Sequence, residues 1–467
     1  AIYCKRLKRK KEKPLNNSKS TDHTINNKEL IKVTASGWLG TAMEFMDFQL
    51  YSLAAAIVFN KIFFANDDPS MGLIMSMGTY GAGYCARLLG AWFFGRLGDK
   101  IGRRDVLFFT ISLMGISSTA IGFLPTYAQV GIWAPIGLVI LRILQGFGAG
   151  AEISGASVMT VEFAQKKNRG FIGSFVCLGT ASGTLFASLI WTIILSKCSE
   201  TALYSWGWRV PFYASFLIMI IAILIRLFIK ESPIMEAKKE LLEKERLKEL
   251  NEANKEISIE KSRKHKSTVK SFLISAGLRF GQAGNSGLMQ TYLAGFLVTY
   301  IGANSTVATK ANIISSLIAF LTIPLVGWIG DKISRRLTYM ILSLTTAIFA
   351  IPMMMLINTH NTVLITIAMV IGLNTGVQGL SALENVTLPE LFGSLHRMTL
   401  VSLSKEIAGL ISVGFGPIIA ASFVAKASGS WWPLALMVIF FSLVTFFSAK
   451  FAVNTNQRDL DDLDDPM

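Results

Sequence analysis

The sequence predicts an all-α membrane protein in which twelve transmembrane helices form two parallel six-helix halves. Composition is the first reason, because 52% of the 467 residues are hydrophobic, only 16% are charged, and the mean hydropathy is +0.49. The second reason is that residues 106–141, 170–196, 280–309 and 337–383 contain no Asp, Glu, Lys or Arg. A spanning helix needs roughly 20 apolar residues, and these runs lack the alternation of a barrel strand.

A charged turn that occurs twice is the third reason. Residues 95–105 read GRLGDKIGRRD, and residues 327–337, 232 positions later, read GWIGDKISRRL, with seven of eleven positions identical. Six spans are predicted between the two copies, and an even number places both turns on the same side of the membrane. The halves are therefore parallel repeats, related by an axis along the membrane normal.

Polar and proline-containing breaks separate the spans. The uncharged stretch that begins at residue 106 is too long for one helix, and Pro125 and Pro135 divide it. A region rich in Lys and Glu predicts a soluble linker between the halves. The predicted spans are 35–59, 71–97, two within 106–163, 170–196, 209–229, 269–300, 310–329, 338–357, 362–384, 398–425 and 430–452. The predicted divisions are a basic N-terminal segment (1–34), an N-terminal half (35–230), a charged linker (231–267), a C-terminal half (268–452) and an acidic tail (453–467), whose acidic run at 459–465 forms a solvated end.

The net charge of +15 raises the question of a nucleic-acid partner. Most of the 45 Lys and Arg residues fall in segments assigned to one face of the membrane. This asymmetry follows the positive-inside rule and places both termini and both turns in the cytoplasm. The basic run at residues 5–11 is then explained by orientation and by attraction to anionic lipid. We expect a multi-pass protein of the bacterial inner membrane that acts as a monomer on a small-molecule substrate and protons, within the lipid bilayer and without nucleic acid.

Enzyme chemistry is not predicted. The four cysteines, at positions 4, 85, 177 and 198, lack the spacing of metal ligands. The sequence also contains no nucleophile, metal or nucleotide constellation. We expect no cofactor, no bound metal and no catalytic residue.

Four stretches resemble the major facilitator superfamily of transporters, and the resemblance covers essentially the whole chain. The turn at 95–105 is similar to that family's loop between its second and third helices, Gly-x-x-x-Asp-(Arg/Lys)-x-Gly-Arg-Arg, whereas the second copy has Ser334 where Gly is usual. Residues 40–51, 142–152 and 231–233 resemble the branch of metabolite:proton symporters, which includes proline/betaine, α-ketoglutarate, citrate and shikimate carriers. The resemblance implies a carrier that works by alternating access. Departures from the branch's usual Asn, Trp, aromatic residue and Gly occur at Thr41, Phe45, Met46 and Ala151.

Ionisable residues deep in the predicted spans are candidates for function, because placing one there costs at least roughly 2.5 to 3.5 kcal/mol. Glu44, Asp47 and Tyr51 are spaced i, i+3 and i+7, which places them on one face of the first span. A carboxylate that is desolvated and lies near an arginine can be poised to take up and release a proton. We predict proton coupling by Glu44, Asp47 and Glu152. The alternative is that these carboxylates are permanently ion-paired and structural.

Arg87, Arg142 and Arg279 lie near mid-depth in the second, fourth and seventh spans and thus come from both halves. The planar guanidinium suits a carboxylate, so we expect a contact with an anionic substrate group, with pairing to the buried carboxylates as the alternative. Lys405 and Glu406 are adjacent in the eleventh span and point about 100° apart, so they cannot be a simple mutual pair. We expect one of them to face the opposite half or a turn, in a structural role. The predicted substrate-binding residues are Tyr51, Arg87, Arg142, Gln145, Arg279, Gln282, Asn285, Tyr292 and Gln378.

The charged turns have a predicted role as a cytoplasmic gate. Asp99 is expected beside the N-terminus of a neighbouring helix, where the helix dipole favours a carboxylate. A Glu and an Arg stand seven residues apart where the fourth span ends, and again where the tenth ends. The expected pairs are Arg103 and Arg104 with Glu162, and Arg335 and Arg336 with Glu390. Such pairs would hold the halves together when the cytoplasmic side is closed; orientation by positive charge alone is the alternative. The predicted gate residues are Asp99, Arg103, Arg104, Glu162, Arg169, Asp331, Arg335, Arg336, Glu390 and Arg397.

The predicted function is uptake of a small organic acid or zwitterion, such as a carboxylate metabolite, betaine or proline, by proton symport. A negative-inside membrane opposes entry of a lone anion by about 2.3 kcal/mol per charge per 100 mV, and co-moving protons reverse that opposition. A proton-coupled exporter or antiporter is one alternative, although the fifth span has Gly173, Gly179 and Gly183 without the Gly-Pro-rich motif usual in such exporters. A non-transporting nutrient sensor is the other, with the linker as its only possible output element.

Overall fold

The computed structural model describes residues 27–54, 58–59, 62–64, 69–228, 260–293, 296–297, 300–303, 305–456, 458–460 and 465. Within these ranges the regular elements are helices, and they follow the order of the twelve predicted spans. The predicted all-α fold is confirmed. The predictions for residues 1–26, for linker residues 229–259 and for tail residues 461–464 lie outside the described residues.

The N-terminal half starts earlier than predicted, because its first helix begins at Asn27 rather than at residue 35. The fourth span is divided near Gly150, where a Cβ would lie 2.1 Å from the backbone oxygen of Arg87. Glycine at this position lets the fourth span pack directly against the second. The helices of this half are α2 (Asn27–Ala54), α4 (Pro69–Ile101), α5 (Arg103–Phe123), α6 (Tyr127–Val130), α7 (Trp133–Ala149), α8 (Glu152–Phe163), η2 (Lys166–Asn168), α9 (Arg169–Lys197), α10 (Glu200–Ser205), η3 (Gly207–Arg209) and α11 (Val210–Leu227).

The C-terminal half repeats this order, and its first helix begins at Glu260, inside the predicted linker. Three of its spans contain a π-helical turn, labelled η4, η5 and η6. Such turns are rare and frequently lie at functional sites. The helices are α13 (Glu260–Ser286), η4 (Gly287–Tyr292), α15 (Ser305–Lys332), α16 (Arg335–Ile357), α17 (Thr362–Leu373), η5 (Asn374–Gln378), α18 (Gly379–Glu390), α19 (Arg397–Gly409), η6 (Leu410–Gly414), α20 (Phe415–Lys426) and α21 (Trp432–Phe451).

Nine helical segments within the described ranges are long and apolar enough to cross a membrane. Helices α2, α4 and α13 are 28, 33 and 27 residues long, but each contains charged side chains that lower its hydropathy. Large apolar side chains cover the outside of the bundle; Phe123, Trp133 and Leu321, for example, are 70%, 70% and 76% exposed. Such a surface is stable where the surrounding solvent is lipid.

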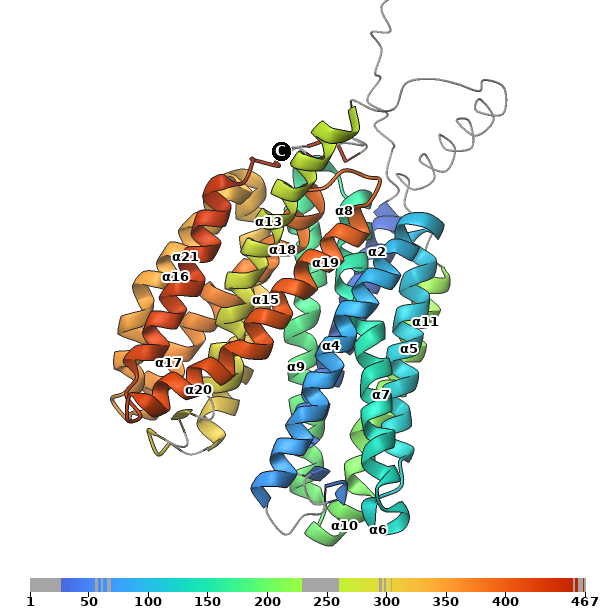
Figure 1. The fold of residues 1–467 in the computed structure, drawn as a ribbon, viewed down its shortest axis with the longest axis vertical. Coiled ribbons are helices and arrows are strands. Elements are labelled where there is room, and N and C mark those ends of the chain that lie inside the picture. Colours follow the sequence, from blue (N-terminus) through green and yellow to red (C-terminus); the bar gives the residue numbers. More distant parts are fainter. Residues whose placement is uncertain are drawn as a thin grey trace, which may run out of the picture.

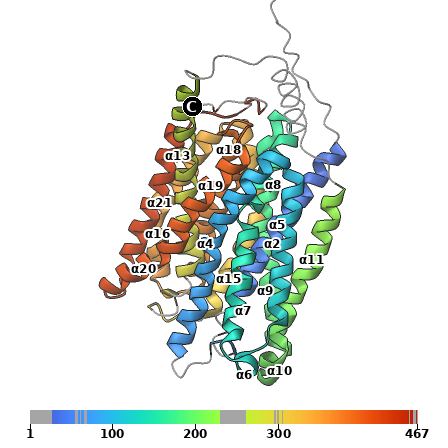
Figure 2. The same ribbon diagram turned by 45° about the vertical axis from the view of Figure 1, so that its right-hand side comes forward.

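The two halves stand side by side, the N-terminal half in blue to green and the C-terminal half in yellow to red (Figures 1 and 2). Between them, α4 packs against α19 and α9 packs against α15. Both contacts depend on the glycine that opens each charged turn. A Cβ at Gly95 would lie 2.8 Å from Cα of Thr399, and a Cβ at Gly327 would lie 2.6 Å from the backbone oxygen of Gly170. We call the end of the bundle that carries both charged turns the turn end.

The described residues of the tail are partly buried. They lie against the turn end, where Thr455 is 2% exposed and Leu460 is 3% exposed. The side chain of Thr455 donates a hydrogen bond to the buried Glu390 at 2.7 Å. Within the predicted solvated end, 459–465, the side chain of Asp459 is 61% exposed, whereas Leu460 is buried because its apolar side chain packs between the halves. Residues 461–464 lie outside the described residues.

Candidate functional site

Arg87 of α4 lies in the interface between the halves and is buried. Its Nη1 contacts Oε1 of Glu44, in the same half, at 2.7 Å. Its Nε and Nη2 donate to the two carboxylate oxygens of Glu406, on α19 of the opposite half, at 2.9 and 3.0 Å. The guanidinium also lies 5.0 Å from the ring centre of Phe48 and 5.4 Å from that of Tyr84. One cation is thus shared by two carboxylates from different halves, and we call Glu44, Arg87 and Glu406 the central cluster.

Glu384 of α18 holds two cations of the C-terminal half. Its carboxylate lies 3.3 Å from Arg279 and 3.0 Å from Lys405. The Lys405 ammonium also donates to Asn385 at 3.2 Å, and Ser157 of the opposite half donates to the same Asn385 oxygen at 3.0 Å. Lys405 therefore pairs with a carboxylate of its own half, whereas the adjacent Glu406 pairs with Arg87 of the opposite half. The two neighbours point to different partners, as predicted.

Asp47 is buried within the N-terminal half. Its two carboxylate oxygens accept hydrogen bonds from Ser118 and Ser215, both at 2.5 Å. Gln145 donates to Ser118 at 2.6 Å and accepts a hydrogen bond from Arg142. A chain of hydrogen bonds therefore connects this carboxylate to a guanidinium, which is the kind of polar network that a low-dielectric interior strengthens.

Arg142 lies over two aromatic rings of α2, with its guanidinium carbon 4.1 Å from the ring centre of Tyr51 and 4.8 Å from that of Phe48. The Tyr51 hydroxyl is hydrogen-bonded to Thr79 of α4. Phe48 is also the ring that lies 5.0 Å from the Arg87 guanidinium. Desolvated contacts of this kind contribute about 2 kcal/mol. One aromatic ring thus connects the two predicted arginines of this half.

Two of the remaining predicted residues lie near the interface. Gln282 accepts a hydrogen bond from Arg279 at 2.7 Å and donates to Ser381 at 2.6 Å. Gln378 of η5 accepts a hydrogen bond from Thr180 of the opposite half at 3.3 Å. Within single halves, Glu152 accepts from Thr110 at 2.5 Å, Asn285 donates to Ser442 at 3.1 Å, and Tyr292 packs against the apolar core.

At the turn end, Asp99 caps a helix of the opposite half. Its carboxylate accepts hydrogen bonds from the backbone N–H groups of Met398 and Thr399, near the start of α19, at 3.1 and 2.9 Å. The Thr399 hydroxyl donates a third hydrogen bond at 2.7 Å. Free N–H groups and the helix dipole both favour a carboxylate at this position. Asp99 therefore lies beside a helix N-terminus, as the sequence predicts.

Glu162 forms ion pairs beside Asp99 at the turn end. Its Oε1 lies 2.9 Å from Arg103 in its own half and 2.9 Å from Arg397, which begins α19 in the other half. Arg103 also lies 3.8 Å from Asp99. We call Asp99, Arg103, Glu162 and Arg397 the first charge cluster.

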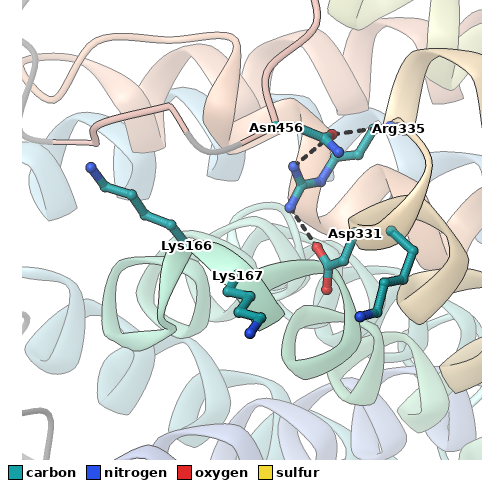
Figure 3. A pocket seen from close by; sticks show the side chains of 6 residues that line it. Lys166, Lys167, Asp331, Arg335 and Asn456 are labelled. Atoms are coloured by element: carbon teal, nitrogen blue, oxygen red, sulfur yellow. Dashed lines mark hydrogen bonds and ion pairs between the residues drawn. The ribbon is translucent and has the colours of Figure 1, made fainter.

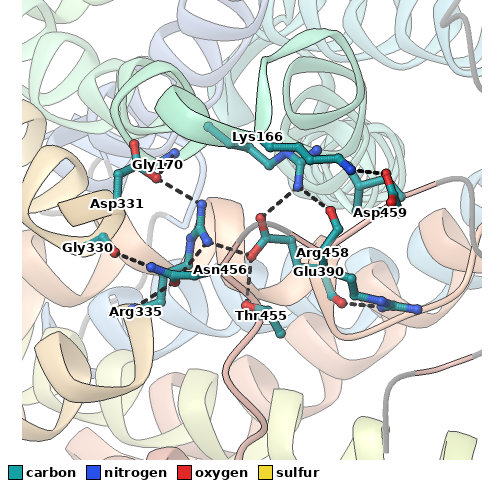
Figure 4. Close-up of polar contacts among 12 residues, drawn as sticks. Lys166, Gly170, Gly330, Asp331, Arg335, Glu390, Thr455, Asn456, Arg458 and Asp459 are labelled. Atoms are coloured by element: carbon teal, nitrogen blue, oxygen red, sulfur yellow. Dashed lines mark hydrogen bonds and ion pairs between the residues drawn. The ribbon is translucent and has the colours of Figure 1, made fainter. Parts of the chain in front are cut away.

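The same cap recurs with the halves exchanged (Figure 4). Asp331 of the second turn accepts hydrogen bonds from the backbone N–H groups of Gly170 and Phe171, at the start of α9, at 2.7 and 2.8 Å. The first turn thus caps the eleventh span, and the second turn caps the fifth. Each charged turn holds the helix that occupies the equivalent place in the other half.

Glu390 is the counterpart of Glu162. Its carboxylate lies 3.1 Å from Arg335 of its own half and 3.3 Å from Arg169, which begins α9 in the other half. Arg335 also lies 3.0 Å from Asp331. We call Asp331, Arg335, Glu390 and Arg169 the second charge cluster.

The pairs differ in one respect from those predicted. In each cluster the expected contact between the glutamate and the first arginine of the turn is present, but it lies within one half. The contact between the halves runs from the glutamate to the arginine that begins the opposite helix. The Glu and Arg residues that stand seven apart in the sequence therefore exchange partners across the interface. Of the second arginines of the turns, Arg104 is partly buried and Arg336 is exposed.

A pocket of about 210 Å³ adjoins the second charge cluster (Figure 3). The side chains that line it are Lys166, Lys167, Asp331, Lys332, Arg335 and Asn456. These residues come from both halves and from the tail. The pocket is therefore a feature of the state in which the three parts meet.

Sequence reasoning missed Glu384, the carboxylate that holds Arg279 and Lys405. A signal exists, because Glu384 directly follows the uncharged stretch 337–383, but ending the tenth span there takes it out of the membrane. Helix α18 in fact continues to Glu390. Sequence reasoning also missed the serines that donate to Asp47 and the serine that donates to Asn385. Nothing in the sequence marks these serines, since small hydroxyl residues are common wherever membrane helices pack.

The buried charges of the site are arranged as ion pairs rather than as a metal-binding group. In the part of the chain that the structure describes, no cluster of three or more His, Cys, Asp or Glu residues is placed to hold a metal ion. The carboxylates contact guanidinium or ammonium groups, or accept hydrogen bonds from hydroxyl groups. The site can thus offer charge, hydrogen bonds and aromatic surface to a small molecule.

Comparison with known proteins identifies the family. The sugar (and other) transporter family matches residues 8–465. The chain belongs to this family. It is therefore a membrane transporter, as the resemblance implied, and not an enzyme.

Named relatives of this transporter cover most of the chain. YdfJ of Escherichia coli (strain K12), a transporter whose name states no substrate, is 48% identical over 90% of this chain and 96% of its own. The shikimate transporter of the same organism is 28% identical over 90% of this chain and 93% of its own. The proline/betaine transporter of Salmonella typhimurium is 31% identical over 96% of this chain and 88% of its own.

Solved structures show the same fold. The proton:xylose symporter XylE bound to 6-bromo-6-deoxy-D-glucose matches with a TM-score of 0.75 at 19% identity, covering 94% of this chain and 99% of its own. The inward-open conformation of the xylose transporter XylE from E. coli matches with a TM-score of 0.61, covering 93% and 99%. At this level of identity the likeness concerns the major facilitator fold alone.

Proposed function

We propose that this transporter imports a small organic acid or zwitterion together with protons by alternating access. The observation that carries the proposal is the central cluster, in which Arg87 is held by Glu44 of its own half and by Glu406 of the other. Protonating a buried carboxylate removes a full charge from its contact with a guanidinium. Protonation of Glu406 therefore loosens a contact between the halves, and protonation of Glu44 changes the charge that Arg87 shares with it. A link between protonation and contact of the halves is the coupling that a proton-driven carrier needs.

The substrate class is argued from the groups beside this cluster. Guanidinium groups bind carboxylates through paired hydrogen bonds, so a substrate carboxylate can take the place of a glutamate at Arg87 or Arg279. Aromatic rings such as Phe48, which lies 5.0 Å from the Arg87 guanidinium, also suit a substrate cation. The relatives named for shikimate and for proline/betaine carry an organic acid and two zwitterions, which supports this class.

We assign the turn end to the cytoplasmic face of the bacterial inner membrane, because the Lys and Arg excess follows the positive-inside rule. We assign the two charge clusters to the gate on that face. Each cluster joins the halves through a buried ion pair and a capped helix N-terminus, so the halves cannot separate there without breaking both. The two halves lie in one chain, which supports function as a monomer.

The test starts with a thermal-shift screen of the purified protein against small carboxylates and betaines. A stabilising compound is then offered to proteoliposomes under an imposed proton gradient, with and without an uncoupler. We expect Asp47→Asn and Glu44→Gln to abolish accumulation against a gradient, because each removes a protonatable group. Glu29→Gln is the control, since Glu29 pairs with Lys32 of the same helix, whose side chain is 44% exposed. Unchanged accumulation in both variants would exclude this proton-coupling role.

The same assay separates the two alternatives. An exporter would expel the compound when the proton gradient is imposed in the uptake direction. A sensor would bind the compound in the screen and move none of it. The gate assignment has its own test, because Asp99→Lys should impair transport while the protein still inserts. Normal transport by that variant would leave the turn with a role in orientation only.

A further inference from the structure

The chain that follows α21 crosses the turn end and contacts both halves. We call its described residues, 453–456 and 458–460, the strap. Thr455 donates to Oε2 of Glu390 at 2.7 Å. Asn456 donates to the backbone oxygen of Gly330 at 3.1 Å and accepts from the Arg335 side chain at 3.0 Å (Figure 4). These hydrogen bonds fasten the strap to the second charge cluster of its own half.

The strap reaches the other half at two further points. The backbone oxygen of Arg458 accepts a hydrogen bond from Arg169 at 3.0 Å. The carboxylate of Asp459 is paired with Lys166 of η2. Both Arg169 and Lys166 belong to the N-terminal half, whereas the strap is continuous with α21 of the C-terminal half. The strap therefore adds contacts between the halves to those made by the charge clusters.

Leu460 lies between the halves. Its side chain is 3% exposed and packs in one apolar group with Val161 of α8 and Val386 of α18. Its backbone oxygen accepts a hydrogen bond from Arg397 at 2.7 Å. Arg397 is the arginine that joins Glu162 across the interface. The apolar contact and the charged contact therefore lie together.

At the turn end, each guanidinium group that joins the halves contacts both a glutamate and the strap. Arg169 donates to Glu390 and to the strap, and Arg397 donates to Glu162 and to the strap. When the halves separate at the turn end, Arg169 must leave the backbone oxygen of Arg458. Separation also has to expose Leu460, because Val161 and Val386 belong to different halves.

From these contacts we propose that the strap is a third part of the gate, in which Arg458 and Leu460 are positioning residues that favour the state closed at the turn end. The proposal rests on the proposed function, since it takes the turn end to be a gate. Its basis is that the strap holds the same two arginines as the charge clusters and seals the interface between them. Loss of the strap should shift the population toward the state open at the turn end, without a change in the substrate site.

The experiment measures opening at the turn end directly. Ser157 is buried at the interface, where it contacts Asn385 of the other half, and it lies on α8 deeper than Glu162. We would introduce Ser157→Cys into a chain whose native cysteines are replaced, and follow alkylation of the purified protein by N-ethylmaleimide. Leu460→Asp should raise the alkylation rate at least roughly tenfold, since burying a leucine contributes more than the 1.4 kcal/mol that equals a factor of ten.

Val453→Asp is the matched control, because it adds the same charge to the same segment at a position that is 41% exposed. A chain that ends at Asn454 is the second variant, and it should show the same rise as Leu460→Asp. If the Leu460→Asp protein fails to accumulate in the membrane, the alkylation rate of the shortened chain tests the proposal instead. Equal alkylation rates for the strap variants and for Val453→Asp would overturn the proposal.

Two further measurements distinguish a role of the strap in opening from a loss of stability and from a failure of the proposed gate itself. The thermal stability of each variant reports a merely structural loss, which would lower the unfolding temperature without raising alkylation and would also overturn the proposal. Asp99→Lys in the same background tests the gate itself. A rise with Asp99→Lys but none with Leu460→Asp would exclude the strap and leave the proposed gate intact.

Discussion

The two charged turns of this transporter make similar contacts with the opposite half, but they differ in the contacts that the strap makes with them. Each turn opens with a glycine that lets the halves approach, and each then caps a helix of the opposite half with an aspartate. The second cluster receives side-chain hydrogen bonds from the strap through Thr455 and Asn456, whereas Arg397 of the first cluster donates to the backbone oxygen of Leu460. In it the turn arginine lies 3.0 Å from the turn aspartate, against 3.8 Å in the first cluster. The repeated residues thus produce the reciprocal contact, and the unrepeated tail makes the two copies unequal.

The largest expected effect comes from the buried glutamates. Glu162→Gln leaves Arg103 and Arg397 without the carboxylate that lies 2.9 Å from each of them. Breaking a buried ion pair by removing one partner costs about 3 to 5 kcal/mol. We expect Glu162→Gln to destabilise the closed state by an amount in this range. The alkylation rate of Ser157→Cys and the unfolding temperature measure the change.

The equivalent substitution Glu390→Gln sharpens the comparison. We expect a smaller loss, because the distances at Glu390 are 3.1 and 3.3 Å and Arg335 retains Asp331 at 3.0 Å. Glu29→Gln, which breaks a pair within one helix with the 44%-exposed Lys32, should change stability by less than about 1 kcal/mol. Equal losses at Glu162 and Glu390 would mean that Asp331 does not compensate Arg335 for the lost carboxylate.

The two capping aspartates should give the next largest effect. Asp99→Asn and Asp331→Asn each replace a carboxylate that accepts two backbone N–H groups of the opposite half by a neutral amide. Charge-assisted hydrogen bonds of this kind contribute about 2 kcal/mol. We expect similar increases in opening for the two variants, measured by the same alkylation assay. A change in only one of them would show that the reciprocal caps are not energetically equivalent.

Much of this arrangement could be predicted from the sequence. Hydropathy and the repeated turn are sufficient for the twelve spans and the parallel halves, because both depend on local composition and on counting. The position of Asp99 beside a helix N-terminus follows from the same turn. The sequence does not predict that Glu162 pairs with Arg397 and Glu390 with Arg169. Spacing along the chain does not show whether a side chain contacts its own copy of the repeat or the other copy.

The parts that could not be predicted involve long-range packing. Glu384 lies at the edge of an uncharged stretch, and its partners Arg279 and Lys405 are on other helices, so its role appears only when the helices are assembled. Leu460 stands within an acidic run whose composition indicates solvent exposure. Its burial depends on Val161 and Val386, which are far from it in the sequence. The composition of a segment can be read from the sequence, whereas its burial depends on the distant residues that pack against it in the fold.

The smallest expected effect comes from a position where the backbones of the two turns differ. Gly102 has φ 128°, a conformation that residues with a Cβ rarely adopt, whereas Ser334 at the equivalent position has φ 176°, which is ordinary extended backbone. Gly102→Ala should therefore cost about 1 kcal/mol in backbone strain. Ser334→Ala should change the free energy of unfolding by no more than about 0.5 kcal/mol, because the backbone there is unstrained and the half-buried side chain makes a single described hydrogen bond. Unfolding temperatures of the two variants test this pair. An equal loss in both would mean that the second turn depends on its serine side chain, which donates to Asn454 at 3.2 Å, as much as the first depends on its glycine.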